Sequence, residues 1–173
     1  MMNEKTIQSI EGLVRELEYG TGVTGYLGLL HHLQIDPDSV VPYLKWAEDH
    51  YTRKLLFSND EVEMILMCWK PGQTSPIHSY DDQEGWIYVI EGVLTIDHYF
   101  RSSVNHSMEH YQTLKLGPGK FLYLNDYIGF HRVRNDGPEN VVSLHIHAGP
   151  VTRWNVYDPE TKKFYEHRPS VEK

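Results

Sequence analysis

The chain lacks several features that would assign it to a specialised class of protein. Its 173 residues include one cysteine, Cys68, so no internal disulfide can form and a reducing cytoplasm is the expected compartment. An apolar leader and a run of eighteen apolar residues are both missing, which argues against a membrane partner. Basic residues are few, with 16 Lys and Arg against 24 Asp and Glu. The resulting net charge of −8 also argues against a nucleic-acid partner.

The length and composition fit an ordinary folded domain. A chain of this length is expected to form one domain, residues 1–173, whose core is large enough to need neither a disulfide nor a structural metal. Aromatic residues make up 12% of the chain and supply bulky core side chains. We expect a helical segment over residues 1–50 and a barrel over residues 51–160.

Helical periodicity is confined to the first fifty residues. Between residues 6 and 19, apolar side chains recur at three- and four-residue steps, which predicts an amphipathic helix. A second helix is predicted over residues 39–50, with Pro42 in its first turn, where no amide donor is missed.

The rest of the chain has the pattern of an all-β protein. Short apolar or alternating runs predict strands over residues 61–69, 84–96 with a break at Gly92, 112–116, 121–124, 129–134, 141–147 and 152–157. Strands at this spacing, with Pro and Gly turns and no helices between them, indicate an antiparallel sandwich or barrel. Phe164 and Tyr165 are expected to tie the polar tail to the barrel.

The eleven histidines fall into two groups. Seven have no partner at a metal-binding spacing, and surface or capping roles in helices or loops are predicted for His31, His32, His50, His98, His106, His110 and His167. The other four are His78, His131, His145 and His147, which lie in or beside expected strands. Alternation puts Ser143, His145 and His147 on one face of a strand. A strand with its polar face in water has the same pattern, so periodicity alone does not decide between a site and a solvated face.

Two groups of spaced residues resemble the signature motifs of a cupin. The first contains Gly72, His78, Tyr80, Glu84 and Gly92, and the second contains His131 and Asn135. Within the cupins, blocks at residues 51–53, 64–69, 75–78, 124–133 and 143–145 resemble the type I cysteine dioxygenase family. The resemblance implies an all-β, cupin-type double-stranded β-helix (jelly-roll) barrel with N-terminal α-helices.

Members of that family hold a mononuclear non-haem iron on histidines and use O₂ to oxidise a thiol to a sulfinate. The resemblance therefore implies Fe(II) as cofactor and L-cysteine as substrate. It assigns His78 and His131 to the metal, and it assigns Arg53, with Tyr51 nearby, to the substrate carboxylate. There are two alternatives. The substrate could be another small thiol such as 3-mercaptopropionate, or the protein could be a non-catalytic cupin that binds or senses a small carboxylate. The chain is compatible with a monomer or a dimer.

The resemblance also places Ser143 and His145 around the pocket, where family members use them to orient a tyrosine. This chain has His147 in place of that tyrosine, and we expect all three residues to assist catalysis. Tyr80 stands where the family has its second metal-binding histidine, so the two residue types are exchanged.

The exchange leaves the third metal ligand open. Tyr80 as a phenolate, Glu84 as a carboxylate and His147 as an imidazole are the three alternatives, and a pocket without iron is the fourth. Animal members carry a cysteine at the position of Gly85, which joins the pocket tyrosine in a thioether. Gly85 and His147 together exclude that cofactor here.

Overall fold

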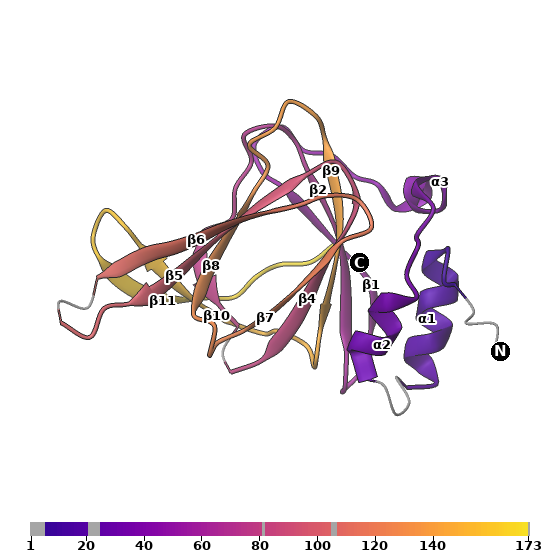
Figure 1. The fold of residues 1–173 in the computed structure, drawn as a ribbon, viewed down its shortest axis with the longest axis horizontal. Coiled ribbons are helices and arrows are strands. Elements are labelled where there is room, and N and C mark those ends of the chain that lie inside the picture. The colour runs from indigo at the N-terminus through magenta and orange to yellow at the C-terminus, as the bar shows by residue number, and fades with distance from the viewer. Residues whose placement is uncertain (1–5, 21–24, 81, 105–106, 173) are drawn as a thin grey trace. The chain divides into compact units, whose positions relative to one another are not determined.

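The computed structural model describes residues 6–20, 25–80, 82–104 and 107–172 (Figure 1). The chain forms two compact units, one up to Leu44 and one from Lys45 onward. The first unit is helical and the second contains all the strands.

The helical unit contains α1 (Ile10–Glu18), α2 (Gly25–His31), α3 (Pro37–Val40) and the 3-10 helix η1 (Val41–Tyr43). The hydroxyl of Ser9 caps α1 by accepting a hydrogen bond from the Gly12 amide at 3.1 Å. Ile10, Leu13 and Leu17 form the buried face of this helix. The structure confirms a helix within residues 6–19, and α2 is an additional helix that the pattern did not predict.

The predicted helix over residues 39–50 is wrong. Helix α3 ends at Val40, the 3-10 turn η1 follows, and the backbone is already extended at Leu44 (φ −65°, ψ 133°). Pro42 has no amide with which to continue the hydrogen bonds of α3, so it lies in the first turn of η1, where none is needed. The helix that it begins is a single 3-10 turn and does not reach residue 50.

The second unit consists of two antiparallel sheets (Figure 1). One sheet has the order β1-β2-β9-β4-β7, formed by Thr52–Ser58, Glu63–Trp69, Val141–His147, Glu84–Glu91 and Phe121–Asn125. The other has the order β11-β10-β3-β8-β5-β6, formed by Lys163–His167, Trp154–Asp158, Ile77–Ser79, Phe130–Arg134, Leu94–Arg101 and Met108–Leu116. Every expected strand is present, His78 lies in a short strand, β3, and β1 and β11 are additional.

The interior between the two sheets is apolar over most of its extent. Ile65 and Ile87 from the first sheet pack in one cluster with Ile96 and Val133 from the second, and none of them is more than 2% exposed. The break at Gly92 is confirmed by its positive φ of 77°, and a Cβ there would lie 2.7 Å from the carbonyl oxygen of Asn140.

The C-terminal segment returns to the free edge of β1. The amide of Leu55 donates to the carbonyl of Glu172, and the amide of Glu172 donates to the carbonyl of Arg53, both at 2.8 Å. These bonds cover part of an edge strand that would otherwise expose its backbone groups. The prediction for the polar tail is refined: Phe164 and Tyr165 lie in β11, which pairs with β10.

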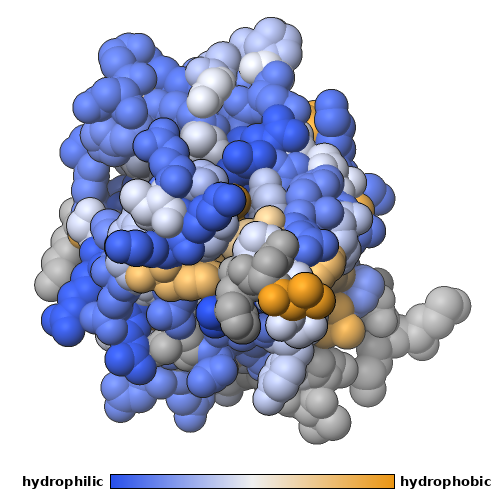
Figure 2. Space-filling view, turned by 90° about the vertical axis from the view of Figure 1, so that its left-hand side faces the viewer, coloured by the Kyte–Doolittle hydropathy of each residue, from blue (hydrophilic) through white to orange (hydrophobic). Residues whose placement is uncertain are grey.

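The face in Figure 2 is mostly hydrophilic, with a small central apolar area. In the part of the chain that the structure describes, no helix combines the length and apolarity needed to cross a membrane.

Candidate active site

The register of strands β3 and β8 brings two distant histidines together. His78 and His131 are directly paired across these strands, and their ring centroids lie 4.3 Å apart. Both are buried, with 4% and 2% exposure. Two imidazoles that bind one ion at adjacent positions, each nitrogen about 2 Å from the metal, have centroids roughly 4–5 Å apart. The pair therefore has the spacing of two metal ligands.

The hydrogen bonds of this pair leave nitrogen lone pairs available. Nδ1 of His78 lies 2.9 Å from the carbonyl oxygen of Pro76. A carbonyl can only accept, so Nδ1 carries the proton and Nε2 keeps its lone pair. Nε2 of His131 is buried and has no hydrogen-bond partner among the described residues. Burial lowers the pKa of His78 to about 4 and that of His131 well below its ordinary value, so both rings are neutral.

Tyr80 lies between this pair and His147. Its ring centroid is 4.7 Å from His131, 5.7 Å from His78 and 5.1 Å from His147. The backbone amide of Tyr80 donates to a carboxylate oxygen of Asp126 at 2.7 Å, which fixes the chain where β3 ends. Burial raises the pKa of the Tyr80 phenol, so the hydroxyl is protonated in the protein itself.

His147 is paired with a residue that the sequence analysis missed. Its Nδ1 lies 3.1 Å from a carboxylate oxygen of Glu63, directly opposite on β2. Burial lowers the pKa of His147, and the bond to Glu63 opposes that shift. The alternation of β2 offered the signal, because Glu63 has the same parity as Ile65, which faces the core.

Ser143 and His145 form a separate hydrogen-bonded pair. The Ser143 hydroxyl accepts from Nε1 of Trp69 at 2.9 Å and lies 3.0 Å from Nε2 of His145. Since the buried hydroxyl accepts from Trp69, its own proton is free to be donated to His145. The rings of His145 and His147 are 6.5 Å apart, so the serine and the two histidines are not one continuous relay.

Arg53 places a buried positive charge beside these rings. It is 8% exposed, and Nη1 donates to the carbonyl of Ser170 at 3.1 Å. Its Nε has no hydrogen-bond partner in the described ranges, and no carboxylate there forms an ion pair with it. Burial lowers the pKa of Arg53, although a guanidinium stays protonated at neutral pH.

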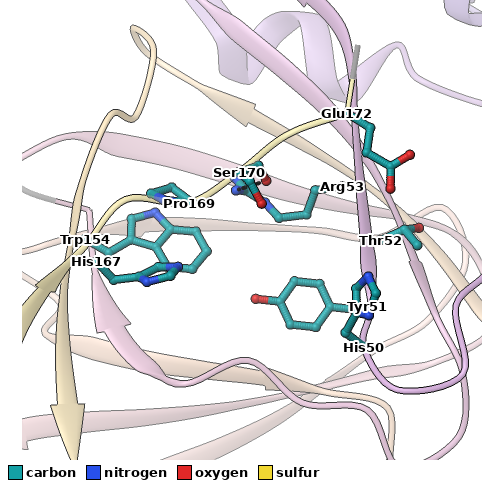
Figure 3. A pocket seen from close by; sticks show the side chains of 9 residues that line it. All are labelled: His50, Tyr51, Thr52, Arg53, Trp154, His167, Pro169, Ser170 and Glu172. Atoms are coloured by element: carbon teal, nitrogen blue, oxygen red, sulfur yellow. Dashed lines mark hydrogen bonds between the residues drawn. The ribbon is translucent and has the colours of Figure 1, made fainter.

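Two cavities meet at Arg53. The inner one, of about 20 Å³, is lined by His78, Tyr80, His145 and His147, and the outer one, of about 230 Å³, is open to solvent (Figure 3). Both are lined by Tyr51, Arg53 and Trp154. A volume of 20 Å³ has room for about one water molecule or a metal ion.

Trp154 is the second residue that the sequence analysis missed. Its indole stacks on His78 at 4.3 Å, and the Arg53 guanidinium lies 4.9 Å above the indole. Its position was encoded by the pairing of β10 with β3, where Val156 opposes His78. Tyr51 contributes to the opposite wall by stacking on Trp69 at 4.3 Å.

Glu84 and Gly85 have different surroundings. The carboxylate of Glu84 accepts a hydrogen bond from the Tyr123 hydroxyl, and Glu84 does not line the inner cavity within the described part of the chain. A Cβ on Gly85 would lie 2.8 Å from Cδ2 of His147 and 3.4 Å from Cε2 of Tyr80. Glycine therefore leaves the space in which these two rings meet.

The remaining histidines do not all match their predicted surface or capping roles. His98 lies in β5 and is 2% exposed, and neither ring nitrogen has a partner among the residues described. His110 and His167 are exposed, as predicted, but lie in β6 and β11 and not in loops, because the strands extend beyond their apolar runs. His106 lies outside the described residues.

These residues fit a transition metal. Two neutral imidazoles with available lone pairs and an adjacent phenol offer borderline nitrogen and oxygen donors. The described ranges contain no group of three or more His, Cys, Asp or Glu arranged to hold a metal ion. A third ligand to a metal on His78 and His131 would therefore be a residue of another type, such as Tyr80, or would require the His147 ring to move toward them.

Comparison with known proteins identifies the family. The family described as cysteine dioxygenase type I matches residues 6–160. The chain belongs to this family. Cysteine dioxygenase type 1 of Danio rerio is 25% identical over 163 residues, 89% of this chain and 81% of that protein. The Homo sapiens enzyme of the same name is 25% identical over 167 residues, 93% of this chain and 83% of that protein.

A solved structure supports the fold. An uncharacterised Klebsiella pneumoniae protein with a double-stranded β-helix domain superimposes with a TM-score of 0.53 at 18% identity, covering 68% of this chain and 88% of that protein. The prediction of an all-β, cupin-type barrel with N-terminal helices is confirmed.

Proposed function

We propose that this protein is a thiol dioxygenase that uses O₂ and iron(II) to oxidise L-cysteine to cysteine sulfinate. The observation that carries the proposal is the His78–His131 pair: two buried neutral rings, 4.3 Å apart, beside a buried guanidinium without a carboxylate partner in the described ranges. Family membership supplies the reaction class.

In this proposal Nε2 of His78 and Nε2 of His131 hold the iron. Tyr80 is the favoured neighbour for the third position, because its ring lies 4.7 Å from that of His131 and 5.7 Å from that of His78, and Glu84 is engaged by Tyr123. Bound iron(II) would bring the thiol and O₂ together and activate the O₂, while the sulfur of the thiol would supply the electrons that O₂ takes up as both of its atoms join the sulfur. The neutral state of both imidazoles keeps their lone pairs available at neutral pH.

Arg53 recognises the carboxylate of the substrate. A carboxylate entering a partly closed pocket needs a charged partner, and a guanidinium can offer two donors at once. The buried Nε of Arg53 needs an acceptor, which a substrate carboxylate supplies. Tyr51 and Trp154 form the walls of this entrance, so the acid group lies in the outer cavity and the thiol points toward His78.

The residues around the pair keep water out and hold the rings. Ser143 fixes His145 against Trp69, and Trp154 covers His78. With room for about one water, the inner cavity protects a reactive site from side reactions with solvent. The lone cysteine of the chain suits the cytoplasm as the place of this reaction.

The proposal is tested on protein produced with added iron. We expect about one iron per chain and O₂ uptake that depends on L-cysteine and exceeds the uptake with equal 3-mercaptopropionate. Uptake that favours 3-mercaptopropionate would change the substrate and keep the reaction class. A protein that takes up no iron and consumes no O₂ with either thiol would contradict the proposal and favour a binding cupin.

A further inference from the structure

Glu63 is a buried carboxyl group that the proposed reaction leaves without a role. It is 7% exposed at the start of β2, and its recorded side-chain hydrogen bond is the one to Nδ1 of His147 at 3.1 Å. Placing a carboxyl group inside a barrel costs free energy unless it is well paired. The cost raises the question of what this pairing does for the site.

Three strands hold the His147 ring between Glu63 and Gly85. In the order β2-β9-β4, His147 is directly opposite Glu63 on one side and Gly85 on the other. Side chains directly opposite in an antiparallel sheet lie on the same face, so Glu63 and His147 both point into the barrel. The Nδ1 edge of the ring contacts Glu63, and its Cδ2 edge lies over Gly85, where a Cβ would approach to 2.8 Å.

The contact with Glu63 favours one tautomer of His147. A carboxylate can only accept a hydrogen bond, and with such a partner Nδ1 carries the proton and Nε2 keeps the lone pair. Nε2 is bonded to Cδ2, which places this acceptor on the Gly85 side of the ring.

Tyr80 approaches the same point. Its Cε2, the ring neighbour of the carbon that bears the hydroxyl, lies 3.4 Å from the Cβ position of Gly85. The rings of Tyr80 and His147 meet at 5.1 Å with an interplanar angle of 62°. The Cδ2 edge of His147, which carries Nε2, and the Cε2 edge of Tyr80 thus both lie over the Cβ position of Gly85.

We infer that Glu63 is a positioning residue: it holds His147 in the tautomer that offers Nε2 as an acceptor to the Tyr80 hydroxyl, and so orients this phenol in the inner cavity. The inference rests on the proposed function for its purpose, since the oriented phenol is the neighbour of His78 and His131. The Ser143–His145 pair does not supply this orientation, because its hydrogen bonds run to Trp69.

The first test needs neither iron nor substrate. In ¹⁵N-labelled, metal-free, full-length protein, the His147 signals are assigned by their loss in His147→Asn, and the nitrogen shifts report the tautomer. We expect the proton on Nδ1 in the wild type, loss of this preference in Glu63→Leu and its recovery in Glu63→Asp. Glu84→Leu is the matched control, since it removes a neighbouring carboxylate held by Tyr123 and should leave His147 unchanged.

An Nε2-protonated His147 in the wild type, or an unchanged tautomer in Glu63→Leu, would overturn the inference. If Glu63→Leu does not fold, Glu63→Gln decides by the same measurement. The glutamine keeps the shape of the side chain and can donate as well as accept, so we expect it to weaken the preference for Nδ1.

The second test uses iron-loaded protein. Removal of a carboxylate that orients a histidine at a metal centre typically costs about 10–100-fold in activity. We expect Glu63→Leu to lose kcat by that factor while KM for cysteine and iron content stay near the wild-type values, and Glu63→Asp to recover part of the loss. A raised KM with unchanged kcat would contradict the inference. If the wild-type protein oxidises no thiol, the proposed function is contradicted. The inference about Glu63 is still decided separately, by the tautomer measurement.

Discussion

The barrel interior contains two pairs of histidines that are equally buried and differently bonded. His78 and His131 are 4% and 2% exposed, and His145 and His147 are also 4% and 2% exposed. In the first pair, Nε2 of His131 has no partner among the described residues, and His78 bonds only through the nitrogen on its far side. In the second pair, Ser143 and Glu63 each engage a ring nitrogen. Burial and an unpartnered nitrogen do not by themselves single out this pair, because His98 is 2% exposed and both of its ring nitrogens lack a partner among the described residues. The first pair differs in that its two rings lie directly against each other, 4.3 Å apart.

The largest expected effect separates the two pairs by metal content. His131→Ala should reduce bound iron from about one per chain to near zero, with a loss of thiol-dependent O₂ uptake of at least about 100-fold, because a ligand matters more than the groups that orient it. His145→Ala is the matched variant and should keep its iron, measured by elemental analysis. Equal iron loss in both variants would erase the distinction between the pairs.

Substitution of Arg53 tests whether the carboxylate of the substrate binds beside His78 and His131. Arg53→Ala should lower kcat/KM for L-cysteine, mainly through a higher KM, because the substrate anion loses its charged partner. The fall should correspond to a loss of about 2–5 kcal/mol in transition-state stabilisation. Arg168→Ala removes an exposed arginine of the C-terminal segment and serves as the control. Steady-state O₂ uptake over a range of cysteine concentrations measures both constants. An unchanged KM in Arg53→Ala would place the carboxylate elsewhere.

Substitution of Ser143 tests whether the second pair of histidines has a structural role and does not bind the metal. Ser143→Ala removes the acceptor of Trp69 and the partner of His145, so two buried nitrogens lose a hydrogen bond. We expect the free energy of unfolding to fall by about 2 kcal/mol while the iron content is unchanged. Urea unfolding measures the first and elemental analysis the second. Iron loss in this variant would mean that the bonded pair also holds the metal.

A charged cluster around Asp97, which does not include the four histidines of the two pairs, gives the smallest predicted effect. Burial opposes ionisation of Asp97, yet hydrogen bonds from Arg134, Arg132 and Thr113 outweigh it and hold the pKa of this carboxyl well below its usual range. Its contribution is present above the usual aspartate pKa near 4 and is lost as the pH falls further. Asp97→Asn should lower stability by about 1–2 kcal/mol at pH 7, because the partner arginines are partly exposed.

The pH dependence of unfolding provides the check on this cluster. Urea unfolding between pH 7 and pH 2.5 should show a shallower acid decline for Asp97→Asn than for the wild type. Parallel curves would show that Asp97 does not contribute to the acid limb.

The strands with apolar or alternating runs could be predicted, and the others depended on partners. β3 has three residues and follows Pro76, so its local pattern was too short, and it exists because β8 and β10 pair with it. β11 is mostly exposed, and Phe164 is its half-buried apolar side chain, which is too little for a strand pattern. Pro42 lies in the first turn of a helix, as predicted, but that helix is a single 3-10 turn.

The site residues that belong to sequence motifs could be predicted, whereas the contacts that depend on the register between strands could not. His78, His131 and Arg53 stand in motifs that resemble the family. In the structure His78 and Arg53 line one cavity, and His131 lies against His78. Glu63 meets His147 across 84 residues of sequence. Trp154 reaches His78 only through the pairing of β10 with β3. Such contacts follow from strand order, which local periodicity does not encode.

The most direct test of the central claim is anomalous scattering at the iron edge from crystals of iron-loaded protein. The account predicts one peak within bonding distance of Nε2 of both His78 and His131, on the side of Tyr80. A peak bound to His145 and His147 instead, or no peak near His78 and His131, would contradict it.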